Sequence, residues 1–171
     1  DPEDRDGHDD ADGCPDPDND DDGILDPYDR CVDVPEVING VDDDDGCPDE
    51  APVRVQRGRI VLDERVHFIF DSSHLRSDSL PLLRAVARVM VSHPEYRMLR
   101  VEGHADDVGD DRYNYDLSYH RARSVMRYLA SAGVSAGRMV ALGFGRGNPL
   151  AQGTTTEARA ENRRVEFVLQ H

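Results

Sequence analysis

The chain has 171 residues with 36 acidic and 20 basic side chains, a net charge of −16, and is long enough for one ordinary domain plus an appendage. Residues 1–50 hold 22 of the acids against two arginines, whereas residues 51–171 hold 14 acids and 18 arginines. The sequence contains no apolar run long enough for a membrane-spanning helix and no secretory leader, and we expect no nucleic-acid partner.

Residues 1–50 contain a repeat of 33 residues, in which DGHDDADGCPDPD from Asp6 matches NGVDDDDGCPDEA from Asn39. Because the chain begins inside this repeat, we expect a leader and further parts upstream. All three cysteines, Cys14, Cys31 and Cys47, lie here at nearly even spacing, which predicts a small disulfide-linked module in an oxidising compartment. Their odd number leaves one unmatched, and the spacing does not decide which two pair.

A calcium site is predicted between the two copies of the repeat, in DNDDDGILDPYDRC. Carboxylates alternate at its start, a glycine follows at the sixth position, and aspartates fall at the ninth and twelfth. Ca²⁺ takes roughly six to eight oxygen ligands, and this spacing wraps a short loop around one ion. The predicted ligands are the side chains of Asp18, Asp20, Asp22, Asp26 and Asp29 and the carbonyl of Ile24. The alternative interpretation is a disordered acidic linker.

The CP, NG and DGCP punctuation of residues 1–50 resembles the thrombospondin type 3 repeat, a calcium-binding spacer. The resemblance implies a Cys31–Cys47 disulfide, with Cys14 left for a cysteine upstream; a Cys14–Cys31 bridge is the alternative. It also implies that metal and disulfides supply the order of a segment with almost no apolar core. We therefore expect calcium removal to disorder this half and leave the rest of the chain folded.

Residues 59–171 show the patterns of a compact domain, joined to the acidic half by a connector at residues 51–58. Alternating apolar residues predict a strand or hairpin over 59–70 and short strands over 97–103, 139–144 and 165–169. A helix is predicted over 77–92, where apolar side chains fill one broad arc. Thr154 and Glu157 predict a helix cap after a long loop. Helices alternating with strands predict an α/β (α+β) fold, with helices packed on one mixed sheet.

The second predicted helix, over 117–132, carries a charge where none is expected. At about 100° per residue its apolar arc includes Arg121, whereas Arg123 and Arg127 point away. A guanidinium on an apolar face needs a carboxylate or other ordered partner, because an unpaired buried charge is costly. The preceding loop is rich in Gly and Asp and contains Asp106, the first candidate partner.

Residues 60–170 resemble the C-terminal peptidoglycan-binding domain of the outer-membrane protein A type, which peptidoglycan-associated lipoproteins and flagellar stator proteins share. The matching segments follow family order and spacing and are FIFDSSHL, VEGHADDVG, YNYDLSYHRARSVMRYLASAGV, RMVALGFGRGNPLA and ARAENRRVEFVL. One residue departs from the family pattern: Ala105 stands where the family usually has Thr, so that hydroxyl is missing.

The resemblance implies non-catalytic binding of peptidoglycan through the diaminopimelate of its stem peptide. The far end of diaminopimelate carries an ammonium and a carboxylate on one carbon, and the family's ligand pair falls on Asp106 for the ammonium and Arg121 for the carboxylate. The resemblance also places Asn114 and Arg163 near the ligand and Asp71 in a wall of the site. From the residues alone, we expect a loop turn at Asp106, a helix start at Asn114 and a solvated cation at Arg163. For Arg121 a structural salt bridge to Asp106 or Asp71 is the alternative to a ligand role, and the two are compatible.

Together the resemblances imply a protein of the Gram-negative periplasm that holds the cell wall, with an upstream region in the outer membrane and calcium-bound repeats as a spacer. Two alternatives belong to other classes. A metal-dependent wall hydrolase would use His104, Asp106 and Asp107, but three adjacent ligands in one loop converge poorly on a metal. A calcium-dependent adhesion spacer would bind a protein partner through its repeats, and its domain would bind nothing.

Overall fold

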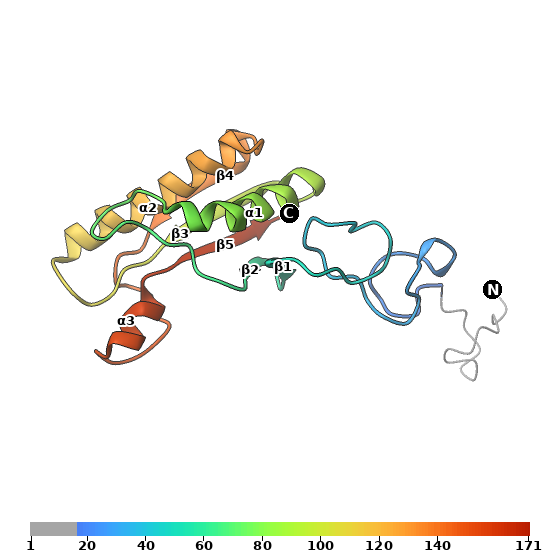
Figure 1. Ribbon diagram of the computed structural model, residues 1–171, viewed down its shortest axis with the longest axis horizontal. Coiled ribbons are helices and arrows are strands. Elements are labelled where there is room, and N and C mark those ends of the chain that lie inside the picture. Colours follow the sequence, from blue (N-terminus) through green and yellow to red (C-terminus); the bar gives the residue numbers. More distant parts are fainter. Residues whose placement is uncertain (1–16) are drawn as a thin grey trace.

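The computed structural model describes residues 17–171, in which an acidic segment extends from one end of an α/β domain (Figure 1). The start of the chain, including Cys14 and most of the first copy of the repeat, lies outside the described residues. No helix within 17–171 is long and apolar enough to cross a bilayer.

The domain is built on one sheet of five strands in the order β1-β2-β5-β3-β4. Their bounds are β1 Val53–Gln56, β2 Arg59–Leu62, β3 Met98–Gly103, β4 Met139–Gly143 and β5 Val165–Gln170. Strands β3 and β4 are parallel, and the other neighbouring pairs are antiparallel. The sheet is therefore mixed, and the predicted fold class is confirmed.

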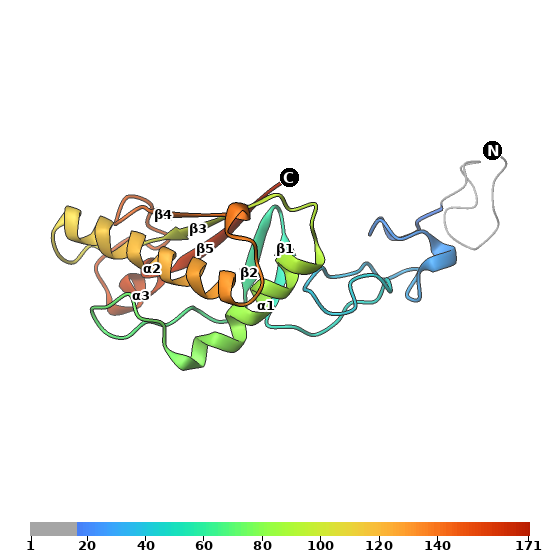
Figure 2. The same cartoon turned by 90° about the horizontal axis from the view of Figure 1, so that it is seen from above.

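Two long helices, α1 (Leu80–Ser92) and α2 (Asp111–Ser131), pack on one face of this sheet (Figure 2). Their apolar arcs meet alternate strand residues in a single core, which includes Leu83, Val125, Leu99 and Phe167. A short helix, α3 (Thr156–Asn162), precedes β5 and lies apart from the other two. Three 3-10 turns complete the elements: Asp26–Tyr28, Ser77–Ser79 and Ala136–Arg138.

Four expected boundaries differ in the structure. The connector at 51–58 contains β1, which forms a hairpin with β2. Residues 66–70 form no strand beyond one bridge between Phe68 and Leu75, because the chain turns at Asp71, whose φ is 51°. Helix α2 begins at Asp111 instead of residue 117, since the Asp110 side chain accepts the first free N–H groups. Thr155, not Thr154, caps α3.

The acidic segment is folded and contacts the domain at the end of α1. Its Cys31–Cys47 disulfide confirms the expected pairing, with the two Cα atoms 5.1 Å apart. The Ile38 carbonyl accepts a hydrogen bond from Val55 of β1, and Asp43 accepts one from His93 Nε2 at 2.8 Å. The side chains of His93 and Asp43 are only 13% and 5% exposed, so this contact is largely dry.

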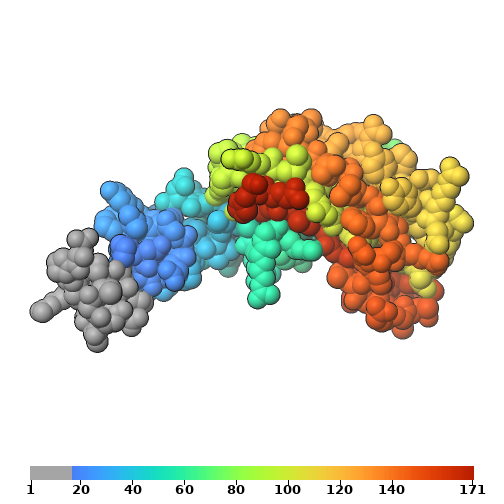
Figure 3. Space-filling view, turned by 180° about the vertical axis from the view of Figure 1, so that it is seen from behind, coloured from blue at the N-terminus to red at the C-terminus, as the bar shows by residue number. Residues whose placement is uncertain are grey.

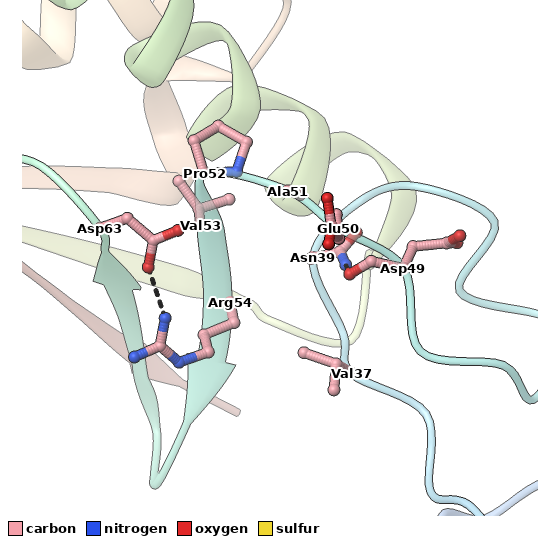
Figure 4. A pocket seen from close by; sticks show the side chains of 9 residues that line it. All are labelled: Val37, Asn39, Asp49, Glu50, Ala51, Pro52, Val53, Arg54 and Asp63. Carbon is pink, nitrogen blue, oxygen red and sulfur yellow. Dashed lines mark hydrogen bonds and ion pairs between the residues drawn. The ribbon is translucent and has the colours of Figure 1, made fainter.

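A hollow of about 540 Å³ lies where the acidic segment joins the β1–β2 hairpin (Figure 4). Asn39 is buried there and donates to the Asp49 carbonyl, and Arg54 pairs with Asp63 across the hairpin. The acidic segment occupies the end of the molecule farthest from the start of α2 (Figure 3). The two regions for which function is predicted are therefore at opposite ends.

Candidate functional site

The loop after β3 is fixed at the end of the sheet where α2 begins. Backbone hydrogen bonds join His104 to the Arg164 carbonyl at 2.9 Å and Ala105 to the Gly145 carbonyl at 2.8 Å. Gly103 and Gly143 are paired on the neighbouring strands β3 and β4, and a Cβ atom on either would collide with α2. Helix α2 thus lies directly on the ends of these strands, beside the loop.

A cleft of about 630 Å³ opens between this loop, the start of α2 and residues 65–71. All five residues expected to contact ligand line it, although they come from four separate segments of the chain: Asp71, Asp106, Asn114, Arg121 and Arg163. Ala105, which replaces the family's Thr, lines it too.

Asp106 is paired with Arg163 inside the cleft. The Arg163 Nη1 donates to Asp106 Oδ2 at 2.5 Å, and the Val108 N–H donates to Oδ1 at 3.0 Å. The Asp106 side chain is 12% exposed, so this carboxylate keeps one narrow face toward the cleft. Arg163 is 43% exposed, and its contact with Asp106 fixes the orientation of that carboxylate.

Arg121 is a half-buried cation of the cleft that has no carboxylate partner, and Arg65, which is exposed, also lines the cleft without a salt bridge among the described residues. Its Nε donates to the Ser72 carbonyl at 3.0 Å, and its Cζ lies 5.1 Å from the centre of the Phe68 ring. Within residues 17–171 it forms no salt bridge, so the structural bridge to Asp106 or Asp71 that the residues alone suggested is absent. Burial lowers the pKa of Arg121, and the charge of Arg163 adds to this. A half-buried guanidinium held by a carbonyl and a ring has donors left for an anionic ligand.

Two further residues shape the cleft walls. The Tyr113 hydroxyl donates a short hydrogen bond to Asp71, which raises the pKa of Tyr113. Asn114 is buried and its amide donates to the Val108 carbonyl at 2.8 Å, so it clamps the loop onto α2. Asp71 is thereby oriented by a hydroxyl, while the Asn114 amide is used within the protein.

The other acids of the loop are engaged in local contacts. Asp107 pairs with Arg159 at 2.7 Å, Asp111 pairs with Arg146, and Asp110 caps α2. His104 is 2% exposed, and burial followed by the charge of Arg164 lowers its pKa to about 4. The structure does not bring His104, Asp106 and Asp107 together, and the hydrolase interpretation loses its metal ligands.

The predicted calcium loop brings three carboxylates together. One oxygen each of Asp18, Asp20 and Asp22 lie within 4.8 Å of one another. Buried oxygens of Asp18, Asp20 and Asp29 have no hydrogen-bond partner, as a cation site requires. Asp26 accepts from the Asn19 N–H at 3.0 Å, and the N–H of Ile24 donates to Asp22 at 2.7 Å, so both stabilise the loop. The residues present fit an oxygen-bound divalent cation.

Sequence reasoning missed three contributors to these two sites. Tyr113 orients Asp71, and the Phe68 ring lies against Arg121. Each lies over 40 residues from its partner, and Phe68 also belongs to a segment expected to be a strand. Glu36 joins the acidic loop: its N–H donates to Asp22, and burial raises its pKa to about 7. An acidic residue just after Pro35 in an otherwise apolar stretch was the available signal.

The cleft and sheet define a ligand-binding α/β domain, and comparison with known proteins identifies its family. Residues 67–163 match the OmpA family, more than half of the chain, and the chain belongs to that family, whose domain is structural and not catalytic. The chain is similar to outer membrane porin F of Pseudomonas aeruginosa, with 42% identity over 91% of the chain and 42% of that protein. A peptidoglycan-associated lipoprotein of Legionella pneumophila is 37% identical over 59% of the chain and 57% of that protein.

Solved structures show the same fold. The peptidoglycan-associated lipoprotein of Burkholderia pseudomallei matches with a TM-score of 0.58 and 35% identity, covering 64% of the chain and 92% of that structure. A MotB-like protein of Desulfovibrio vulgaris matches with a TM-score of 0.60 and 30% identity, covering 70% and 80%. The chain spans less than two thirds of the curated relatives it matches.

Proposed function

We propose that the domain binds peptidoglycan without altering it, by holding the diaminopimelate head group of a stem peptide in the cleft. The observation that carries the proposal is Arg121, a half-buried guanidinium without a carboxylate in the same cleft as a fixed carboxylate, Asp106. Relatives named peptidoglycan-associated lipoproteins support the polymer as the ligand.

The side chains of Arg121 and Asp106 would bind the two charged groups of a zwitterion. The free donors of Arg121 suit a carboxylate, which a guanidinium can bind with two parallel hydrogen bonds. The exposed face of Asp106 suits the ammonium, and Arg163 keeps that carboxylate in place without filling the cleft. Each charge-assisted hydrogen bond contributes about 1.5–3 kcal/mol, so loss of either group costs roughly 10- to 100-fold in affinity.

The test is a titration with muropeptides that contain diaminopimelate and with matched muropeptides that contain lysine. Lysine keeps the ammonium but lacks the distal carboxylate, so we expect it to bind weakly. Arg121→Lys keeps the charge but loses the fork and should weaken binding of diaminopimelate, as should Asp106→Asn. The matched control is Arg123→Lys, an exposed site on the opposite face of α2. Equal affinity of all three variants and the parent would remove the proposal.

We further propose that the acidic segment is a calcium-bound spacer between the domain and an upstream part in the outer membrane, which places the domain in the periplasm. The unpartnered oxygens of Asp18, Asp20 and Asp29 support the metal. The similarity to outer membrane porin F extends over 91% of the chain, which supports an upstream part in the outer membrane. Calcium titration of Asp20→Asn against the exposed control Asp33→Asn tests the site; equal calcium affinity of the two would exclude it.

A further inference from the structure

A second group of ligating side chains lies on the sheet face that α1 and α2 leave uncovered. Val101 of β3 and Phe167 of β5 face the helices, so the alternating residues Glu102 and Glu166 face the other way. These two glutamates are direct partners in the antiparallel register of β3 and β5. Like charges directly opposite each other destabilise a sheet unless a cation lies between or beside them.

Arginines satisfy part of this need from the rim. Arg100 pairs with Glu102, and Arg59 and Arg164 both pair with Glu166. The side chains of Arg59 and Arg100 are 53% and 33% exposed, so both can turn outward into water, whereas Arg164 is 10% exposed and stays beside Glu166. The two carboxylates are themselves only 8% and 18% exposed.

His104 completes the group and has no partner of its own. Its ring is 2% exposed and stacks on the Phe144 ring at 5.1 Å, and neither ring nitrogen has a hydrogen-bond partner. Buried polar groups are nearly always satisfied, so the unpaired ring nitrogens leave His104 available to take a ligand through one of them. One atom each of Glu102, His104 and Glu166 lie within 4.8 Å of one another.

We propose that Glu102, His104 and Glu166 form a binding site for Zn²⁺. One imidazole nitrogen and two carboxylate oxygens make a three-ligand set that zinc accepts, with water as the fourth ligand, whereas Ca²⁺ and Mg²⁺ prefer oxygen alone. Of the three residues, Glu166 also lines a groove of about 310 Å³, together with Arg59 and Arg164. The site is separate from the ligand cleft and does not depend on the function proposed for it.

The experiment follows the ring nitrogens of the histidines by ¹⁵N NMR while Zn²⁺ is added to the full chain. The parent for this test is Cys14→Ser in saturating calcium, so that neither a thiol nor the acidic segment competes for zinc. The His104 signals, identified as those missing in His104→Phe, should shift as one equivalent is added. Signals that stay in place at saturating zinc would overturn the proposal.

Two glutamine variants separate ligation from folding. Glu166→Gln removes a ligand, and metal sites lose about tenfold or more in affinity when even an outer partner is lost, so we expect at least that weakening. Glu161→Gln changes an exposed glutamate that lines the same groove but lies outside the group, and should bind zinc like the parent. Equal zinc affinity of these two variants would also refute the site, and circular dichroism confirms that both are folded.

Discussion

Replacing Gly103 with alanine tests the close packing of α2 on the sheet. A Cβ atom at Gly103 would lie 2.0 Å from the carbonyl oxygen of Ser118, a backbone atom that no side-chain rotation can move. Real contacts of this kind are about 3 Å or longer, so the helix must retreat by roughly 1 Å, and overpacking of a core typically costs about 1–3 kcal/mol. Because the obstacle is backbone, we expect the upper end of this range.

The expected result is a fall of roughly 10 °C in Tm, since a domain of this size loses about 4 °C per kcal/mol. Helix α2 also carries Arg121, so affinity for the ligand should fall with it. The matched control is Gly137→Ala, where the nearest atom to the new Cβ is the Ser135 Oγ at 3.9 Å and the backbone tolerates alanine. That variant should melt at or slightly above the parent temperature. A Gly103→Ala protein that melts within about 3 °C of the parent would refute the packing argument.

Three further outcomes are expected. Asp110→Ala removes the N-terminal cap of α2 and should lower the free energy of unfolding, measured in urea, by about 1 kcal/mol. Asp116→Ala changes an exposed site further along the helix and should leave that free energy nearly unchanged. Equal losses in the two variants would contradict the capping role. Burial alone lowers the pKa of His93, but its hydrogen bonds to Asp43 and Glu95 outweigh burial and raise it. The His93–Asp43 contact should therefore contribute its full stabilisation of the fold below about pH 6.5 and lose it as pH rises through the raised pKa of His93. Urea midpoints that fall with rising pH in the parent but not in His93→Gln would show this. Parallel pH profiles of the two proteins would contradict it. Chelation of calcium should expand residues 17–50 in small-angle scattering while the amide signals of the sheet persist; unchanged scattering would contradict a metal-ordered segment.

The periodic elements of the domain could be predicted from the sequence. The apolar arc of α1 and the alternation of β5 each depend on local spacing, and the burial of a charge on α2 followed from its place in the same arc. The hairpin strand β1 was missed because VRVQ is short and half polar. The first turns of α2 were missed because DRYNYD has no apolar face and is set by its cap.

The partners within the cleft could not be predicted in the same way. Asp106 and Arg163 are 57 residues apart, and no local pattern links them. The sequence required a partner for Arg121 and suggested a carboxylate, whereas the structure supplies a carbonyl and an aromatic ring. That difference matters for function, because a guanidinium already neutralised by a carboxylate has less to offer an anion.

The arrangement of the molecule has a mechanical consequence. The cleft and the acidic segment occupy opposite ends, so under the proposed function tension between the bound polymer and an upstream anchor would run along the whole domain. The Cys31–Cys47 disulfide closes a loop with a sequence separation of 16, which a pull cannot extend. At roughly 3.4 Å per residue the bond shields about 50 Å of chain from stretching. Reduction of the disulfide would release that length of chain.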